Sequence, residues 1–202
     1  GAGVWLAGSS ALAESTSANE QIQFACVGVG GKGRSDSSDA GRSGKVVAIC
    51  DIDERNLEKA SGRFKEAKRF FDFRDMFHQM GDRIDAVTVS TPDHIHAVAA
   101  VMGMKMGKHC YCQKPLTHSI WEARQLGDIA REKGVATQMG NQWTNYSPMR
   151  EAAYQIRAGQ LGTVKEVHIW TDRPIWPQGE PRPPEKPVPA YLDWESWIGP
   201  AP

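Results

Sequence analysis

The stretch Cys26-Val27-Gly28-Val29-Gly30-Gly31-Lys32-Gly33 decides the fold that we expect for this chain. Before it, residues 22–27 form a short apolar run, which is typical of a buried parallel strand. After it come a segment of small polar residues, a second apolar run over residues 46–50, and Asp51. The order strand, glycine turn, helix, strand and acid is the fingerprint of a dinucleotide-binding βαβ unit.

The residues of this fingerprint have separate physical tasks. Gly28 allows a tight turn, Gly30 lets the backbone approach a pyrophosphate, and Gly33 lets the helix pack closely on the strand. The helix N-terminus offers free N–H groups and a partial positive charge to phosphates. Asp51 can accept both hydroxyls of an adenosine ribose and would repel a 2′-phosphate. We therefore expect NAD as the cofactor, with NADP possible because Arg55 lies nearby.

The composition argues against several classes of partner. Lys and Arg together number 24, as do Asp and Glu, so no overall field recruits nucleic acid or an anionic membrane. Three of the four cysteines stand in apolar, strand-like runs, where a free thiol behaves as a small hydrophobe. We expect no metal site, because no second close pair and no histidine cluster accompanies Cys110 and Cys112.

The first 19 residues resemble the remnant of an export signal. Residues 1–12 are small and apolar, and Ala11-Leu12-Ala13 has the A-x-A form of a signal-peptidase site. The basic region that opens such signals is absent, so the sequence would begin inside one. We expect an exported, periplasmic protein. A disordered tail on a cytoplasmic protein is the alternative. The stretch is too short and too rich in glycine to span a bilayer.

Six apolar runs alternate with helical segments in a domain that we place at residues 20–143. We expect strands at about 22–27, 45–50, 68–71, 85–90, 108–112 and 135–139, and helices at about 32–40, 54–67, 74–80, 94–106 and 119–133. Asp53 and Asp93 are placed to cap the second and fourth helices. This alternation predicts an α/β fold, a Rossmann-type doubly wound parallel sheet in the order 3-2-1-4-5-6.

The pattern changes beyond the sixth strand. A helix is expected from Ser147 to about Ala158, and residues 164–170 alternate like a half-exposed strand. From Pro174 onward, proline and tryptophan prevail, and we expect Trp194 and Trp197 to pack a second domain. One strand cannot bury an apolar face alone. We therefore interpret residues 144–202 as the truncated start of an α+β substrate domain.

Three segments carry a resemblance to a known family. Residues 110–116, Cys-Tyr-Cys-Gln-Lys-Pro-Leu, resemble the E-K-P segment of the Gfo/Idh/MocA oxidoreductases, the family of glucose–fructose oxidoreductase and inositol dehydrogenase. Residues 90–96 resemble its T-P-x-x-x-H turn after the fourth strand, and residues 140–142 fall where members place a loop facing substrate and nicotinamide. The resemblance runs from about residue 22 to the end, and the exported, proline-tailed form is similar to the twin-arginine-secreted branch.

The resemblance implies NAD(P) in the first domain, a sugar, polyol or cyclitol substrate in the second, and a homo-oligomer formed through the second domain. It also implies that Lys114 hydrogen-bonds the substrate hydroxyl. A partly desolvated ammonium beside that hydroxyl favours the alkoxide that hydride loss requires. A solvated lysine in a turn is the alternative. The residues that we expect to bind the cofactor are Gly28, Gly30, Gly31, Lys32, Gly33, Asp51, Thr91, Pro92, His96, Gln113, Lys114 and Asn141, with Lys114 also catalytic.

One residue departs from the family pattern, because Gln113 stands where members have a glutamate. Its neutral amide offers no negative charge to Lys114, which leaves the polarity of the substrate and the reaction open. We expect an NAD(P)-dependent oxidoreductase whose acid–base pair lies beyond Pro202. The alternatives are an NAD-dependent glycosidase of the same fold, which oxidises its sugar transiently, and a nucleotide-binding module without turnover.

Overall fold

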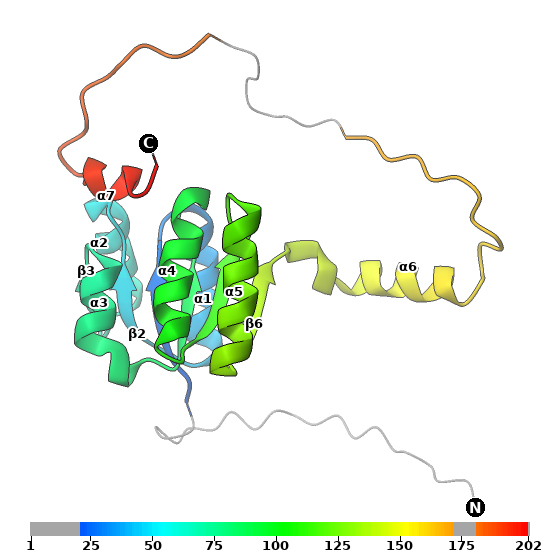
Figure 1. The fold of residues 1–202 in the computed structure, drawn as a ribbon, viewed down its shortest axis with the longest axis horizontal. Coiled ribbons are helices and arrows are strands. Elements are labelled where there is room, and N and C mark those ends of the chain that lie inside the picture. The colour runs from blue at the N-terminus through cyan, green and yellow to red at the C-terminus, as the bar shows by residue number, and fades with distance from the viewer. Residues whose placement is uncertain (1–20, 172–180, 202) are drawn as a thin grey trace, which may run out of the picture.

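A parallel six-stranded sheet forms the centre of the molecule (Figure 1). The computed structural model describes residues 21–171 and 181–201. Neighbouring strands are parallel throughout, in the order β3-β2-β1-β4-β5-β6. This confirms the predicted Rossmann-type order. The strands are β1 (Gln23–Val27), β2 (Lys45–Cys50), β3 (Lys68–Phe70), β4 (Ala86–Val89), β5 (His109–Gln113) and β6 (Thr137–Gly140).

Helices cover both faces of the sheet. In Figure 1, α3, α4 and α5 lie in front of it and α1 and α2 behind it. Two buried clusters fill the spaces between these layers. The larger includes Phe77 of α3 and Leu126 of α5, and the smaller includes Leu57 of α2. The helices are α1 (Gly31–Ser43), α2 (Glu54–Arg63), α3 (Phe73–Met80), α4 (Asp93–Lys105), α5 (Ile120–Lys133), α6 (Ser147–Arg157) and α7 (Trp194–Ile198), with short 3₁₀ turns η1 (Gly81–Arg83) and η2 (Gln142–Asn145).

Side chains cap four of the described helices, α2, α3, α5 and α7, whereas α1, α4 and α6 begin without a side-chain cap. Asp53 accepts the N–H of Arg55 at 2.9 Å and caps α2 as predicted. The predicted cap by Asp93 is wrong, since Pro92 occupies the N-cap of α4 and no side chain caps that helix. Because the helix starts one residue earlier than expected, Asp93 is already helical and its carboxylate sits in the first turn, where it faces the helix dipole.

The first helix is longer than expected, running past Gly41 to Ser43. Gly41 does not end it. A Cβ at this glycine would stand 3.0 Å from the Phe64 ring, so the absence of a side chain lets α1 pack against the segment after α2. Gly44 is the residue that follows the helix.

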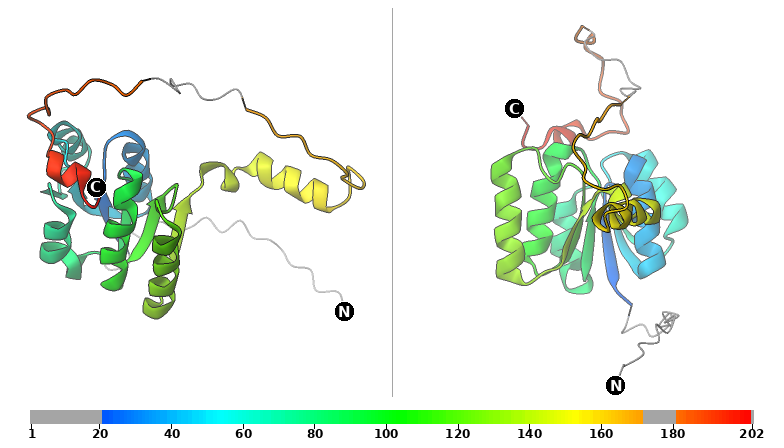
Figure 2. Two further views of the ribbon diagram at one scale, coloured as in Figure 1. Left: turned by 45° about the horizontal axis from the view of Figure 1, so that its top comes forward. Right: turned by 90° about the vertical axis from the view of Figure 1, so that its right-hand side faces the viewer.

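Beyond β6 the chain leaves the sheet. Helix α6 extends away from the β6 edge (Figures 1 and 2), and all its residues are exposed. The strand predicted at residues 164–170 is wrong, because this stretch has no regular structure and its side chains are exposed. A strand needs a neighbour for its backbone N–H and C=O groups, and none lies beside this stretch in the described part of the chain.

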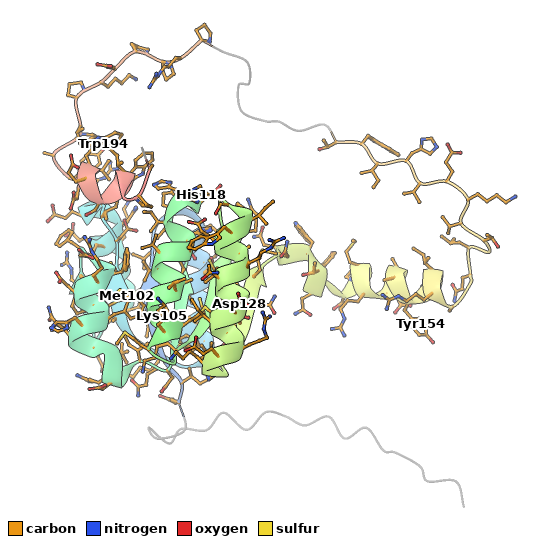
Figure 3. The ribbon with its side chains drawn as sticks, viewed as in Figure 1. Met102, Lys105, His118, Asp128, Tyr154 and Trp194 are labelled. Carbon is orange, nitrogen blue, oxygen red and sulfur yellow. The ribbon has the colours of Figure 1, made fainter. Side chains whose placement is uncertain are left out.

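Residues 189–201, which we call the returning segment, come back to the sheet. Leu192 forms an antiparallel bridge with Asp53, just after β2. The N–H of Glu54 donates to Tyr191 O at 3.1 Å, and that of Asp193 donates to Ile52 O at 3.2 Å. These bonds set α7, which carries Trp194, against the end of the sheet where β2 stops (Figure 3).

Two of the predicted segments fall on residues that the structure does not describe. The export signal at residues 1–19 and the start of the proline-rich stretch at Pro174 lie in ranges 1–20 and 172–180, which the structure does not describe. Among the described helices, none combines the length and the apolar character that a bilayer crossing requires.

Candidate functional site

A cavity of about 820 Å³ opens at the carboxyl ends of β1, β2 and β4. Its walls come from the glycine turn after β1, the tip of β2, the start of α3, the β4–α4 loop and the returning segment. In open parallel sheets, ligands bind at this edge, where the strand order reverses between β1 and β4. The cavity is therefore where the topology of the sheet predicts a binding site.

The glycine turn is shaped by backbone packing. Gly28 has φ of +78°, a conformation that side chains disfavour, and its N–H donates to Cys50 O at 2.8 Å. A Cβ at Gly33 would stand 1.9 Å from Gly28 O, and one at Gly28 would stand 2.6 Å from Ser90 O. Gly28 and Gly33 therefore perform the structural tasks that the motif predicts.

Asp51 connects this turn to the tip of β2. One carboxylate oxygen accepts the N–H groups of Val29 at 2.9 Å and Gly30 at 3.1 Å, and the other accepts that of Asp53 at 2.9 Å. A carboxylate has about four acceptor positions, so Asp51 keeps capacity for a ligand hydroxyl. Nothing in the sequence indicates that Asp51 also holds the glycine turn.

The β4–α4 loop forms the facing wall with Thr91, Pro92 and Ile95. His96 does not line the crevice as expected, because its ring is buried behind the loop with 1% exposed. Its Nδ1 lies 2.7 Å from Pro115 O and its Nε2 lies 2.8 Å from Thr91 O. His96 therefore links the loop after β4 to the loop after β5.

A buried carboxylate that sequence reasoning missed lies beside the glycine turn. Asp36, on α1, accepts hydrogen bonds from Lys32 Nζ at 2.6 Å, Ser90 Oγ at 2.7 Å and Gln113 Nε2 at 3.0 Å. The i,i+4 spacing of Lys32 and Asp36 was the one available signal for this group. Its other two partners are far away in the sequence: Ser90 is separated from Asp36 by 54 positions and Gln113 by 77 positions.

Lys114 lies at the same edge of the sheet but outside the cavity wall. It follows β5, its side chain is exposed, and its peptide bond to Pro115 is cis. Gln113 pairs with Gly140 across β5 and β6, so Lys114 and Asn141 follow paired residues. Lys114 and Asn141 therefore stand at the ends of neighbouring strands.

The residues that we predicted to bind the cofactor fall into two groups, those in the cavity wall and those outside it. The cavity wall includes Gly28, Gly30, Gly31, Lys32, Asp51, Thr91 and Pro92. Outside that wall, but next to it in the loops or on the neighbouring strand ends, lie Gly33, His96, Gln113, Lys114 and Asn141.

Charges in the wall are unevenly distributed. Among the described residues, the acids Asp51, Asp53, Asp72 and Glu195 line the cavity, against the cations Lys32 and Arg74. The side-chain hydrogen bond from Arg55 lowers the pKa of the Asp53 carboxyl, and that from Arg74 lowers the pKa of Asp72. Both acids therefore stay ionised near neutral pH. Burial raises the pKa of the Cys50 thiol, so this wall residue is no nucleophile at neutral pH.

The returning segment closes the cavity on the side of β2 and α4. Trp197 lines the cavity, and its backbone oxygen lies 2.7 Å from His94 Nε2. The Trp194 and Trp197 rings stack with centroids 5.0 Å apart. We expected these two tryptophans to pack a second domain, and this is wrong in the described structure. Backbone hydrogen bonds between the returning segment and residues 52–54 place both tryptophans at the end of the sheet instead.

The first comparison with known proteins concerns the sheet. Residues 22–141 match the family model Gfo/Idh/MocA, described as an oxidoreductase family with an NAD-binding Rossmann fold. The chain belongs to the Gfo/Idh/MocA oxidoreductase family. The match ends within one residue of Gly140, the last residue of β6, so it coincides with the sheet and its helices.

Named relatives of this chain are dehydrogenases. Inositol 2-dehydrogenase of Rubrobacter xylanophilus is 28% identical over 156 residues, 75% of this chain and 44% of the relative. Levoglucosan dehydrogenase of Pseudarthrobacter phenanthrenivorans is 28% identical over 125 residues, 59% of this chain and 30% of the relative. The chain spans less than half the length of these relatives.

Solved structures show the same fold. Scyllo-inositol dehydrogenase from Lactobacillus casei, with bound NAD(H) and scyllo-inositol, superposes with a TM-score of 0.65 at 22% identity. The superposition covers 71% of this chain and 43% of that one. The WlbA dehydrogenase from Bordetella pertussis, in complex with NADH and UDP-GlcNAcA, gives 0.63 at 23% identity, covering 70% of this chain and 44% of the other.

Proposed function

We propose that this chain binds NAD in the cavity beside the glycine turn, as the cofactor-binding part of an oxidoreductase. The enzyme would transfer a hydride between the nicotinamide and a hydroxyl of a sugar, polyol or cyclitol. The observation that supports it best is that the cavity joins the glycine turn and the Asp51 carboxylate in one space. The names of the family relatives support the class of substrate.

The N-terminus of α1 is suited to the pyrophosphate. Its N-cap, Gly30, makes no side-chain capping bond, and no acidic residue stands in its first turn. By contrast, Asp53, Asp72 and Ser119 cap α2, α3 and α5. An uncapped N-terminus beside a cavity leaves N–H groups and a partial positive charge for an anion. The phosphates would therefore lie at the start of α1, beside Gly31 and Lys32, since the N–H of Gly30 already donates to Asp51.

The tip of β2 favours NAD over NADP. Asp51 and Asp53 both line the cavity there, and their negative charges would repel a 2′-phosphate. Arg55 is the nearby cation, but its guanidinium donates to both oxygens of Asp53 at 3.1 and 2.7 Å. It also lies 3.4 Å from the centroid of the Tyr191 ring. Arg55 is thus already bound and is poorly placed to receive a phosphate.

Lys114 is our candidate for the catalytic cation. It stands at the carboxyl end of β5 next to Asn141 at the end of β6, on the same sheet edge as the cavity. When bound there, NAD would supply the hydride acceptor. The Lys114 ammonium would hydrogen-bond the reacting hydroxyl and stabilise negative charge on its oxygen. We propose that the proton acceptor is a residue in the part of the enzyme that the relatives have and that this chain does not cover.

Export and assembly are further parts of this proposal. The A-x-A pattern at residues 11–13 supports export to the periplasm, which N-terminal sequencing of the protein from its native cells would test. Exposed aromatic side chains between residues 143 and 170, such as Trp143 and Tyr154, would be covered in a homo-oligomer or by a second domain. Light scattering of the full-length protein would test the oligomer.

A binding titration tests the cofactor site. We expect Asp51→Ala to weaken NAD binding by about tenfold or more, or roughly 1.4 kcal/mol, and to weaken NADP binding less. Asp82→Ala is the matched control, since Asp82 is an exposed acid in η1, outside the cavity wall. Isothermal titration with NAD and NADP measures both. Unchanged NAD affinity in Asp51→Ala would remove this assignment.

A further inference from the structure

Asp36 occupies a central position among the side chains at the carboxyl edge of the sheet. Its carboxylate is buried, with 5% of the residue exposed, and it accepts hydrogen bonds from three side chains. The donors come from three different elements: Lys32 from the start of α1, Ser90 from the end of β4, and Gln113 from the end of β5. A buried carboxylate is stable only with such partners, so its position and theirs depend on one another.

The same carboxylate fixes which way the Gln113 amide points. A glutamine amide has one donor end and one acceptor end, whereas an ionised carboxylate only accepts. Gln113 Nε2 therefore faces Asp36 at 3.0 Å, and Oε1 is left to accept the backbone N–H of Lys114 at 3.2 Å. A Cβ at Gly140 would stand 2.6 Å from Nε2, so β6 packs closely on the amide.

The other oxygen of Asp36 binds Lys32, a residue of the cavity wall at the glycine turn. Lys32 lines the cavity, and its ammonium lies 2.6 Å from Asp36 Oδ1 and 2.9 Å from Ser35 Oγ. One buried group therefore touches the cation at the glycine turn and, through one amide, the backbone of Lys114.

We propose that Asp36 is a positioning residue that orients the Gln113 amide, and through it the Lys114 backbone, while holding Lys32 at the glycine turn. The two ends of the site are thereby coupled: an anion that draws Lys32 away from Asp36 changes the hydrogen bonding of Gln113 and Lys114. This coupling to a cofactor rests on the proposed function, whereas the orientation of the amide does not.

Exchanging the two side chains tests the orientation. In Asp36→Asn, only one oxygen remains, and we expect it to stay on the Lys32 ammonium, which can only donate. The new NH2 group then faces Gln113, which needs an acceptor there, so Gln113 flips and Lys114 N–H loses its partner. In Gln113→Glu, the amide group that donates to Asp36 is replaced by a second carboxylate, and the two negative charges repel each other. In the double variant D36N/Q113E, the amide introduced on α1 can donate to the carboxylate introduced on β5, whose other oxygen can again accept Lys114 N–H. The double variant should therefore resemble the wild type more than either single variant does.

Amide hydrogen exchange at Lys114, read by NMR on the 202-residue chain, measures this directly. We expect exchange to be about tenfold faster in each single variant, and within about threefold of wild type in the double variant. Asp39→Asn is the control, because Asp39 lies on the same helix with its side chain exposed, and it should leave Lys114 unchanged. Unaltered exchange in a folded Asp36→Asn variant would overturn the proposal. So would a double variant that is unfolded or no better than the single variants.

A second arm adds NAD to the same samples. We expect NAD to shift the Lys114 amide signal in the wild type, and to shift it about threefold less in Asp36→Asn. If NAD does not bind the wild-type chain, the proposed function fails while the exchange result still decides the role of Asp36. If NAD binds and shifts Lys114 equally in both proteins, the coupling is wrong.

Discussion

Two segments follow the sheet, and they behave in opposite ways. Residues 142–171 carry several aromatic side chains that stay exposed, with Trp170 at 86% and Tyr154 at 68%. Tyr154 lies on α6, far from the sheet (Figure 3). The returning segment, residues 189–201, is also rich in aromatic rings, yet it docks on the cavity wall. Aromatic content therefore does not decide which segment docks.

The difference lies in the backbone partners that the sheet offers. The loop after β2 presents Ile52 O and the N–H of Glu54, which pair with the returning segment. Residues 164–170 alternate in hydropathy as a strand does, but no described strand lies beside them. Periodicity predicts an element only where the fold supplies a neighbour for its hydrogen bonds. The returning segment is thus part of the cavity wall, although it is distant in sequence from the glycine turn.

The largest effect should come from the glycine turn, which forms one wall of the cavity that the returning segment also lines. In Gly33→Ala, the new Cβ would stand 1.9 Å from Gly28 O, which is backbone and cannot move aside cheaply. We expect a loss of about 3 kcal/mol or more in the free energy of unfolding, measured by urea denaturation. Gly62→Ala, a glycine of α2 with nothing within 4 Å of its Cβ, should instead gain up to about 1 kcal/mol. Equal stability of the two variants would contradict the packing of the glycine turn.

A variant at Lys114 can distinguish an effect on the reaction from an effect on cofactor binding. Lys114 lies on the same edge of the sheet as the cavity but outside the cavity wall. In the full-length protein, Lys114→Ala should lower turnover more than about a hundredfold, or roughly 2.7 kcal/mol of barrier. NAD affinity should change little. Steady-state rates and NAD titration measure the two effects, and Lys108→Ala, an exchange at a lysine before β5, is the control. Near-normal turnover in Lys114→Ala would make it a structural residue.

The sequence predicts the sheet well because its signals are local. The first two apolar runs, the turn at Gly28 and the acid at Asp51 all lie between residues 22 and 51, and the order of six strands follows from their alternation with helices. The role of Asp36 could not be predicted in this way. Asp36 lies one helical turn from Lys32, but its other two hydrogen-bond partners, Ser90 and Gln113, are distant in the sequence. No periodicity connects positions so far apart.

The same limit applies to His96 and Trp197. The T-P-x-x-x-H turn identifies His96 as a residue of the site, but only the structure shows its ring between two backbone oxygens behind the wall. Trp197 stands in a stretch without periodicity, and its contact with the cavity depends on a bridge between residues 53 and 192. Such a bridge forms only in the folded chain, so no short sequence motif predicts it.

A matched pair of tryptophan variants tests the difference between the two segments. Trp197→Ala removes a ring from the cavity wall, and we expect NAD to bind about tenfold more weakly, or roughly 1.4 kcal/mol. Trp170→Ala removes the same ring from an exposed position and should leave NAD affinity unchanged. Fluorescence titration of both variants gives the comparison. Equal losses in the two would mean that the returning segment has no special place at the site.

The smallest effect is expected on α6. Tyr154 is 68% exposed there, so Tyr154→Ala should change the free energy of unfolding by less than about 0.5 kcal/mol. Phe77→Ala is the buried counterpart, an aromatic residue of α3 with none of its surface exposed, and should cost about 3–5 kcal/mol. Urea denaturation of the 202-residue chain measures both. A loss at Tyr154 approaching that at Phe77 would show that α6 packs on a partner in solution, and the contrast between the two segments would then disappear.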